Sequence, residues 1–116
     1  MEGLGVLIVI GLIGYAIYIN SSSYRYQIAM NLFNAQDYRE ARGILLGIYG
    51  KHKEAPVSYA KCQLALMKAA QSNERVTFLK DISARSKLLP SGVDQTAYSR
   101  INDEAHIFYY EKKFRY

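Results

Sequence analysis

The sequence predicts an all-helical protein of one small domain. Apolar residues recur at intervals of three and four along most of the chain, and no window sustains an alternation of apolar and polar residues. Helix breakers are also sparse after residue 20, where Pro56 and Pro90 are the only prolines. With 116 residues in total, the chain has room for one domain beyond its apolar N-terminal segment.

The first expected element is an apolar helix over residues 3–20. This segment has no charged side chain, and Glu2 is the only charged side chain before Arg25. Its 18 residues rise about 27 Å as an α-helix, close to the roughly 30 Å hydrocarbon core of a bilayer. We therefore expect a transmembrane helix, a single-pass membrane protein and contact with the lipid bilayer.

A cleaved signal peptide is the alternative for this segment. It requires basic residues before the apolar run, and none is present, although Ser21 and Ser23 match the small residues of a cleavage site. For a retained helix, Gly11 and Gly14 provide smooth patches against which another membrane helix can pack.

The charge distribution predicts an orientation for the expected span. Because the basic residues begin at Arg25, the positive-inside rule places the N-terminus outside and the C-terminal domain in the cytoplasm. A bacterial inner membrane is favoured, and an organellar membrane is the alternative.

Five further helices are expected within residues 21–116. Their apolar faces fall within residues 28–33, 41–48, 60–70, 76–82 and 97–108. Turn-forming residues separate the later helices, at Ser72–Glu74 and at Pro90–Gly92.

Residues 29–48, AMNLFNAQDYREARGILLGI, resemble a tetratricopeptide repeat, a helical hairpin with a period of about 34 residues. Ala29 and Ala41 occupy small positions of the two helices, Tyr38 lies at the turn, and Leu45 follows on the second helix. Small residues at these positions let two helices cross closely.

A second, fainter copy lies further along the chain. The stretch LALMKAAQSNERV is similar to AMNLFNAQDYREA, but Asn73 replaces the turn tyrosine and Val76 replaces the small alanine. The resemblance is clear for residues 24–50 and weak for 57–83. It implies a first hairpin over 24–50, a second over 57–89 and a capping helix with an aromatic and basic tail over 94–113. A generic helical bundle is the alternative.

The ionisable residues predict no catalysis, metal, cofactor or small-molecule substrate. His52 and His106 lie on different elements without the spacing of a metal site, and Cys62 is the single cysteine. We expect Cys62 to be a small buried apolar residue.

Tyrosine is the unusual component, with 11 residues and no tryptophan in the chain. Its ring prefers one apolar and one wet side, which protein interfaces supply. The hairpin surface and the aromatic tail give the candidate partner-binding residues, which are Tyr24, Tyr26, Asn31, Tyr59, Gln63, Tyr109, Tyr110, Phe114, Arg115 and Tyr116.

The predicted function is that of a membrane-anchored adaptor. Such a protein would be an accessory or assembly subunit of a larger membrane protein complex and would bind partner proteins through the tetratricopeptide-like surface. The alternative is a basic surface that binds nucleic acid or anionic lipid through Lys51–Lys53 and the C-terminal tail. Nucleic acid is the less expected ligand, because tyrosine and arginine dominate protein interfaces.

Overall fold

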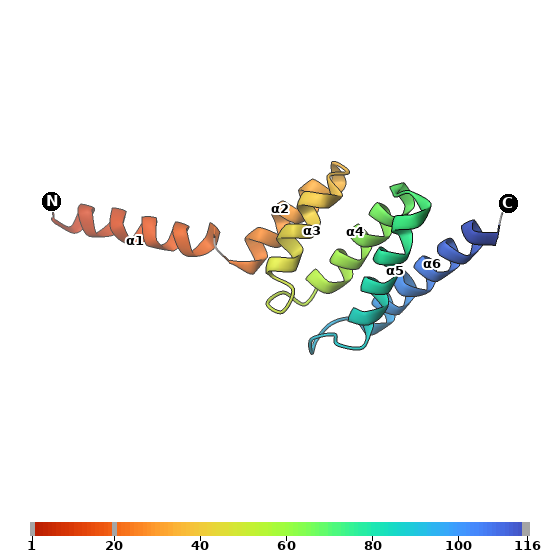
Figure 1. Cartoon of the computed structure of the whole chain (residues 1–116). Coiled ribbons are helices and arrows are strands. Elements are labelled where there is room, and N and C mark those ends of the chain that lie inside the picture. The colour runs from red at the N-terminus through yellow and green to blue at the C-terminus, as the bar shows by residue number, and fades with distance from the viewer. Residues whose placement is uncertain (1, 20, 115–116) are drawn as a thin grey trace.

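The computed structural model describes the backbone of residues 2–19 and 21–114, and the side chains of residues 3, 5–15 and 21–111. Within these residues it has six helices and no strand (Figure 1), so the all-helical prediction is confirmed. The helices are α1 (Glu2–Ile19), α2 (Ser22–Asn34), α3 (Tyr38–Gly47), α4 (Ala55–Ala69), α5 (Ser72–Ser86) and α6 (Gln95–Phe114).

The body of the molecule consists of α2 to α6. Helices α2 and α3 form one hairpin and α4 and α5 a second, with α3 packed against α4; α6 lies against both α4 and α5. Helix α1 extends away from this body and contacts α2 only weakly, which gives the elongated outline seen in Figure 1. The overall extents are 76 × 28 × 17 Å.

The expected transmembrane helix over residues 3–20 is wrong. Among the described residues, no helix is long and apolar enough to cross a membrane. Helix α1 begins at Glu2 and ends at Ile19. The predictions that depended on this span are wrong as well. They are the single-pass topology, its orientation, and the inner-membrane or organellar localisation.

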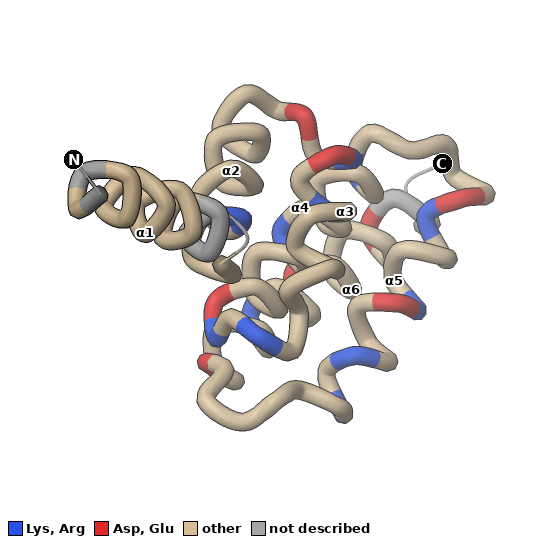
Figure 2. Tube along the Cα trace, turned by 90° about the vertical axis from the view of Figure 1, so that its left-hand side faces the viewer, with Lys and Arg blue, Asp and Glu red and all other residues tan. Residues whose placement is uncertain are grey.

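Helix α1 nevertheless exposes its apolar side chains. Leu7 and Leu12 are 66% and 64% exposed, and an added Cβ at Gly11 or Gly14 would meet no atom within 4 Å. Figure 2 shows that charged residues of both signs are distributed over the body, whereas the described residues of α1 are drawn without them. The packing role expected of the two glycines depended on the membrane span and is withdrawn with it.

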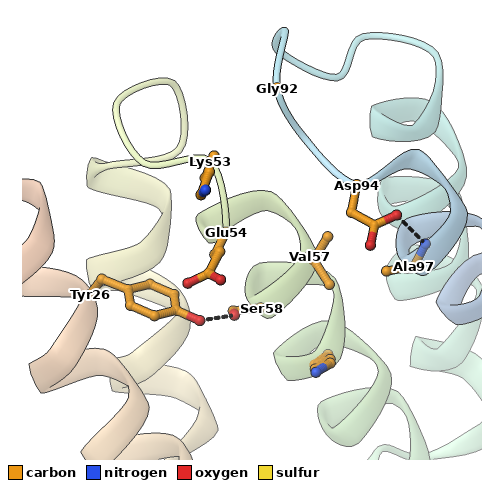
Figure 3. A pocket seen from close by; sticks show the side chains of 9 residues that line it. Tyr26, Lys53, Glu54, Val57, Ser58, Gly92, Asp94 and Ala97 are labelled. Atoms are coloured by element: carbon orange, nitrogen blue, oxygen red, sulfur yellow. Dashed lines mark hydrogen bonds between the residues drawn. The ribbon is translucent and has the colours of Figure 1, made fainter.

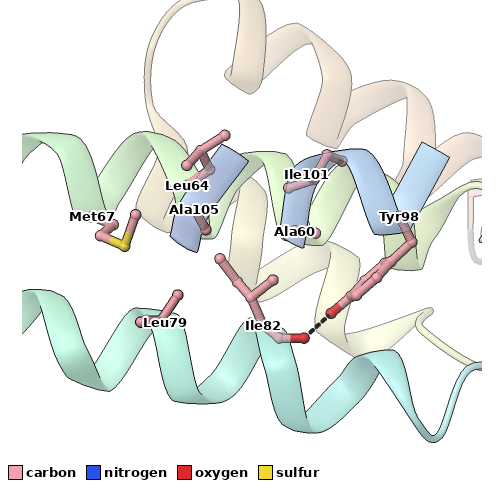
Figure 4. Packing of buried hydrophobic residues seen from close by; sticks show 8 residues of the cluster. All are labelled: Ala60, Leu64, Met67, Leu79, Ile82, Tyr98, Ile101 and Ala105. Atoms are coloured by element: carbon pink, nitrogen blue, oxygen red, sulfur yellow. Dashed lines mark hydrogen bonds between the residues drawn. The ribbon is translucent and has the colours of Figure 1, made fainter. Parts of the chain in front are cut away.

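Two clusters of buried side chains form the core, one on each side of α4. The first joins α2, α3 and α4 through Ala29, Ala41, Leu45, Ile48, Ala55, Tyr59 and Cys62. The second joins α4, α5 and α6 (Figure 4) through Ala60, Leu64, Met67, Leu79, Ile82, Tyr98, Ile101 and Ala105. Apolar burial in both clusters supplies the main stabilisation of the body.

The first cluster agrees with the expected hairpin packing. Ala29 and Ala41, the two expected small positions, are fully buried, as is Leu45. The ring of Tyr38 lies edge-on to Phe33 across the turn, with 5.2 Å between ring centroids. The turn tyrosine therefore joins the two helices of the first hairpin.

The turn between α2 and α3 has the hydrogen bonds of a Schellman motif. The N–H of Gln36 donates to the carbonyl of Phe33, and the N–H of Asp37 donates to the carbonyl of Leu32, both at 2.9 Å. This geometry requires a left-handed residue at Gln36, whose φ is 65°. Residues other than glycine and asparagine adopt this backbone conformation at a cost in free energy.

We expect Gln36→Gly to raise the free energy of unfolding by about 1 kcal/mol, because glycine adopts a left-handed conformation without steric strain. Urea denaturation followed by circular dichroism measures the change. Gln27→Gly, at an exposed position inside α2, is the control and should lower the free energy of unfolding by about 1 kcal/mol. Destabilisation by both variants would contradict the assignment of strain to Gln36.

Candidate polar cavity between α2, α4 and α6

A cavity of about 340 Å³ opens between three helices (Figure 3). Its wall comprises Tyr26 of α2, the start of α4 with the preceding Lys53 and Glu54, and the segment from Gly92 to the first turn of α6. Side chains from three separate parts of the sequence thus meet at one place.

Tyr26 is held in place from two directions. Its hydroxyl is 3.0 Å from Oγ of Ser58 on α4, which joins the first hairpin to the second. Its ring stacks on the imidazole of His52, with 4.3 Å between centroids and an angle of 9° between the planes. His52 is fixed in turn, because its Nδ1 accepts a hydrogen bond from the N–H of Glu54 at 3.2 Å.

Four charged side chains line the cavity. Lys53, Glu54, Lys61 and Asp94 are all exposed, and among the described residues none of them takes part in an ion pair. Asp94 also caps α6, since its Oδ1 accepts a hydrogen bond from the N–H of Ala97 at 3.1 Å. The cavity therefore presents two ammonium groups and two carboxylates to solvent.

A second polar group lies between α3, α4 and α5. Asp81 Oδ2 accepts hydrogen bonds from Nε2 of Gln63 at 2.6 Å and from the hydroxyl of Tyr59 at 2.9 Å. Its Oδ1 is paired with Nε of Arg85 at 3.0 Å. Gln63 also accepts a bond from Nη1 of Arg42 at 2.9 Å. We call these five residues the inter-hairpin network, because they tie α3 and α5 to α4.

The network shifts the proton affinities of its members. Burial alone would raise the pKa of Asp81, but the hydrogen bonds from Gln63, Tyr59 and Arg85 outweigh it and hold the pKa below its ordinary value. Burial, reinforced by the bond to Asp81, raises the pKa of Tyr59 to about 12. The guanidinium of Arg85 lies over the rings of Tyr59 and Tyr49, at 4.7 Å and 5.1 Å from their centroids. Asp81 is therefore a carboxylate at neutral pH.

Tyr59 and Gln63 were expected on the partner-binding surface, and the structure places them elsewhere. Each is only 4% exposed, and the polar atoms of both side chains bond within the inter-hairpin network. They are therefore left out of the surface proposed below.

The other expected partner-binding residues whose side chains are described do not gather at one place, although the rings of Tyr109 and Tyr110 contact each other edge-on. Tyr26 lines the cavity; Tyr24 is half-buried and Asn31 exposed elsewhere on α2. On α6, Tyr109 packs against the second core cluster and Tyr110 is 48% exposed. The side chain of Phe114 and the whole of residues 115–116 lie outside the described residues.

Sequence reasoning missed most of the cavity. Tyr26 and the basic pair Lys51 and Lys53 gave the signals near it, whereas Ser58, Lys61 and Asp94 carried none. These residues belong to different elements, and it is the packing of α2, α4 and α6 that brings them together.

Three sets of chemical groups lie elsewhere in the described chain. Cys62 is fully buried, as expected, and burial raises the pKa of its thiol to about 11. Ser83 lies 3.4 Å from Nε2 of His106, but its hydroxyl donates to Oδ1 of Asn102 at 3.1 Å. Within the described residues, no three His, Cys, Asp or Glu side chains gather as metal ligands.

No protein family, curated protein or solved structure matches the chain.

Proposed function

We propose that this chain is a non-catalytic adaptor, an accessory or assembly subunit that binds a segment of a partner protein at the cavity between α2, α4 and α6. The observation that carries the proposal is the cavity itself, because three helices contribute to it and its charged groups have no ion-pair partner within the described chain. Its volume of about 340 Å³ falls at the lower end of the range for ligand sites. The resemblance of residues 24–50 to a tetratricopeptide hairpin supports binding of a protein.

A preformed wall favours binding. Tyr26 is fixed by Ser58 and His52, so its ring and hydroxyl do not have to be ordered when a partner arrives. Groups that are already ordered lose little conformational entropy on association, and this increases the affinity of a small contact surface.

The alternative basic surface is less well supported. Lys51–Lys53 lies in the loop after α3, and Figure 1 shows this loop and the end of α6 at opposite ends of the body. In the described backbone, the Lys51–Lys53 loop and the C-terminal end of α6 therefore do not lie side by side.

Site-specific photo-crosslinking in cells tests the adaptor proposal. A photoreactive amino acid replaces Lys61, which is exposed at the cavity, in the full chain. The matched control carries it at Thr77, an exposed position on α5, which contributes no residue to the cavity wall. We expect position 61 to crosslink to a defined protein that mass spectrometry identifies and that position 77 does not capture. Absence of a crosslinked protein at position 61, or the same proteins at both positions, would refute the proposal.

A further inference from the structure

The charges of the cavity wall limit the kind of partner segment it can accept. Lys53 and Lys61 provide two positive groups, and Glu54 and Asp94 provide two negative groups. A segment of a single charge sign would be attracted to one pair and repelled by the other, so attraction and repulsion would largely cancel. A segment with both signs can satisfy both pairs.

The positions of the carboxylates suggest how such a segment lies. Figure 3 shows Glu54 on the α4 side of the cavity and Asp94 on the α6 side, with Val57 between them. Val57 and Ala97 are half-buried and apolar, and the alkyl stem of a long basic side chain can pack on such a surface while its charged end reaches a carboxylate.

We propose that the cavity selects a partner segment of mixed charge, in which a basic side chain reaches between Glu54 and Asp94 and a nearby acidic side chain meets Lys53 and Lys61. This proposal rests on the proposed function, since it specifies the chemistry of the segment that the adaptor binds. The four groups act as a charge pattern: the carboxylates determine where the basic residue lies, and the ammonium groups determine where the acidic residue lies.

Selection from a library of random dodecapeptides displayed on phage tests the proposal. The full chain is immobilised as the wild type and as Glu54→Gln and Lys61→Gln, each of which removes one charge and keeps a side chain of similar size. Glu40→Gln on α3 and Lys80→Gln on α5 are matched controls, because both residues are exposed and neither lines the cavity.

We expect the wild type and the controls to enrich peptides that carry a basic and an acidic residue close together. Glu54→Gln should lose the preference for the basic residue, and Lys61→Gln should lose the preference for the acidic one. Fluorescence anisotropy with one enriched peptide should show affinity about threefold to fivefold weaker for each cavity variant, since exposed ion pairs contribute modestly.

Peptides of a single charge sign or of no charge preference would overturn the proposal, as would unchanged preferences in the cavity variants or no enrichment at all. If the photoreactive residue at position 61 still crosslinks to a defined partner, any of these phage-display outcomes overturns only the mixed-charge pattern. Removal of the Lys61 charge by the photoreactive residue is expected to weaken binding only about threefold to fivefold, so the absence of a specific crosslink overturns the adaptor function itself and the two failures are distinguishable.

Discussion

Leu45→Ala is expected to lower the free energy of unfolding by about 3 kcal/mol. Leu45 is fully buried in the first core cluster, where its neighbours include Ala29 and Ala41. Removing its isobutyl group loses the transfer free energy of the side chain and leaves a cavity, because the side chains of Ala29 and Ala41 in the same cluster are too small to fill the space. Urea unfolding of the wild type and the variant, followed by circular dichroism, measures the loss.

The next residue provides a matched control. Leu46 lies on the same helix and is 46% exposed, so Leu46→Ala removes the same group from a more solvent-exposed position. We expect it to cost about 1 kcal/mol or less, in proportion to the smaller buried area. Equal losses for the two variants would contradict the orientation of α3.

Asp81→Ala is expected to lower the free energy of unfolding by about 2 kcal/mol. The substitution removes the carboxylate that accepts hydrogen bonds from the Tyr59 hydroxyl and the Gln63 amide and that forms the ion pair with Arg85. Two of the three donors belong to buried residues, Tyr59 and Gln63. The value is below that of a fully buried ion pair, because the side chains of Asp81 and Arg85 are each 30% exposed. Asp103→Ala on the exposed side of α6 should change stability by less than about 0.5 kcal/mol.

The ionisation of Asp81 is also expected to make the free energy of unfolding depend on pH. The pKa of its carboxyl is lower in the folded chain than in the unfolded chain, so the unfolded state takes up the proton first as the pH falls. The contribution of the carboxylate is therefore complete above about pH 4, the ordinary range of an aspartate, and is lost as the pH falls through the lower folded value. The stability difference between the wild type and Asp81→Asn should narrow over that acidic range. A difference that grows as the pH falls would contradict the lowered pKa.

The sequence predicted the helices of the body well, because burial of one helix face imposes a period that is visible in the residues. Ala29, Ala41 and Leu45 were expected to share a packed hairpin and are all fully buried. The end of α2 was marked less clearly, since a glutamine rather than a glycine takes the left-handed position in the turn.

Hydropathy was a weaker guide for the N-terminal helix. The uncharged segment over residues 3–20 has 18 residues, which is near the lower limit of length for a membrane span. Helix α1 starts one residue before the expected segment, at Glu2, and ends at Ile19. Apolar composition predicted a helix there, but it did not establish that the helix spans a bilayer.

The binding site and the network were largely unpredictable for a different reason. Periodicity reports which residues of one helix face a core, but not which exposed side chains on separate helices will meet. Lys61 and Asp94 are brought to one cavity by the packing of α4 and α6, and Asp81 reaches Gln63 only when α5 returns beside α4. Tyr59 and Gln63 were placed at a partner surface for the same reason, since their inward direction depends on this packing.

The central place of α4 has a consequence for how the body moves. One side of this helix is buried in the first core cluster through Tyr59 and Cys62, and the other in the second through Leu64 and Met67. Neither hairpin can open without wetting one side of α4, which favours a single cooperative unit of local unfolding over two independent ones. Because the cavity includes the first turn of α4, an occupant there restrains the opening of both halves at once.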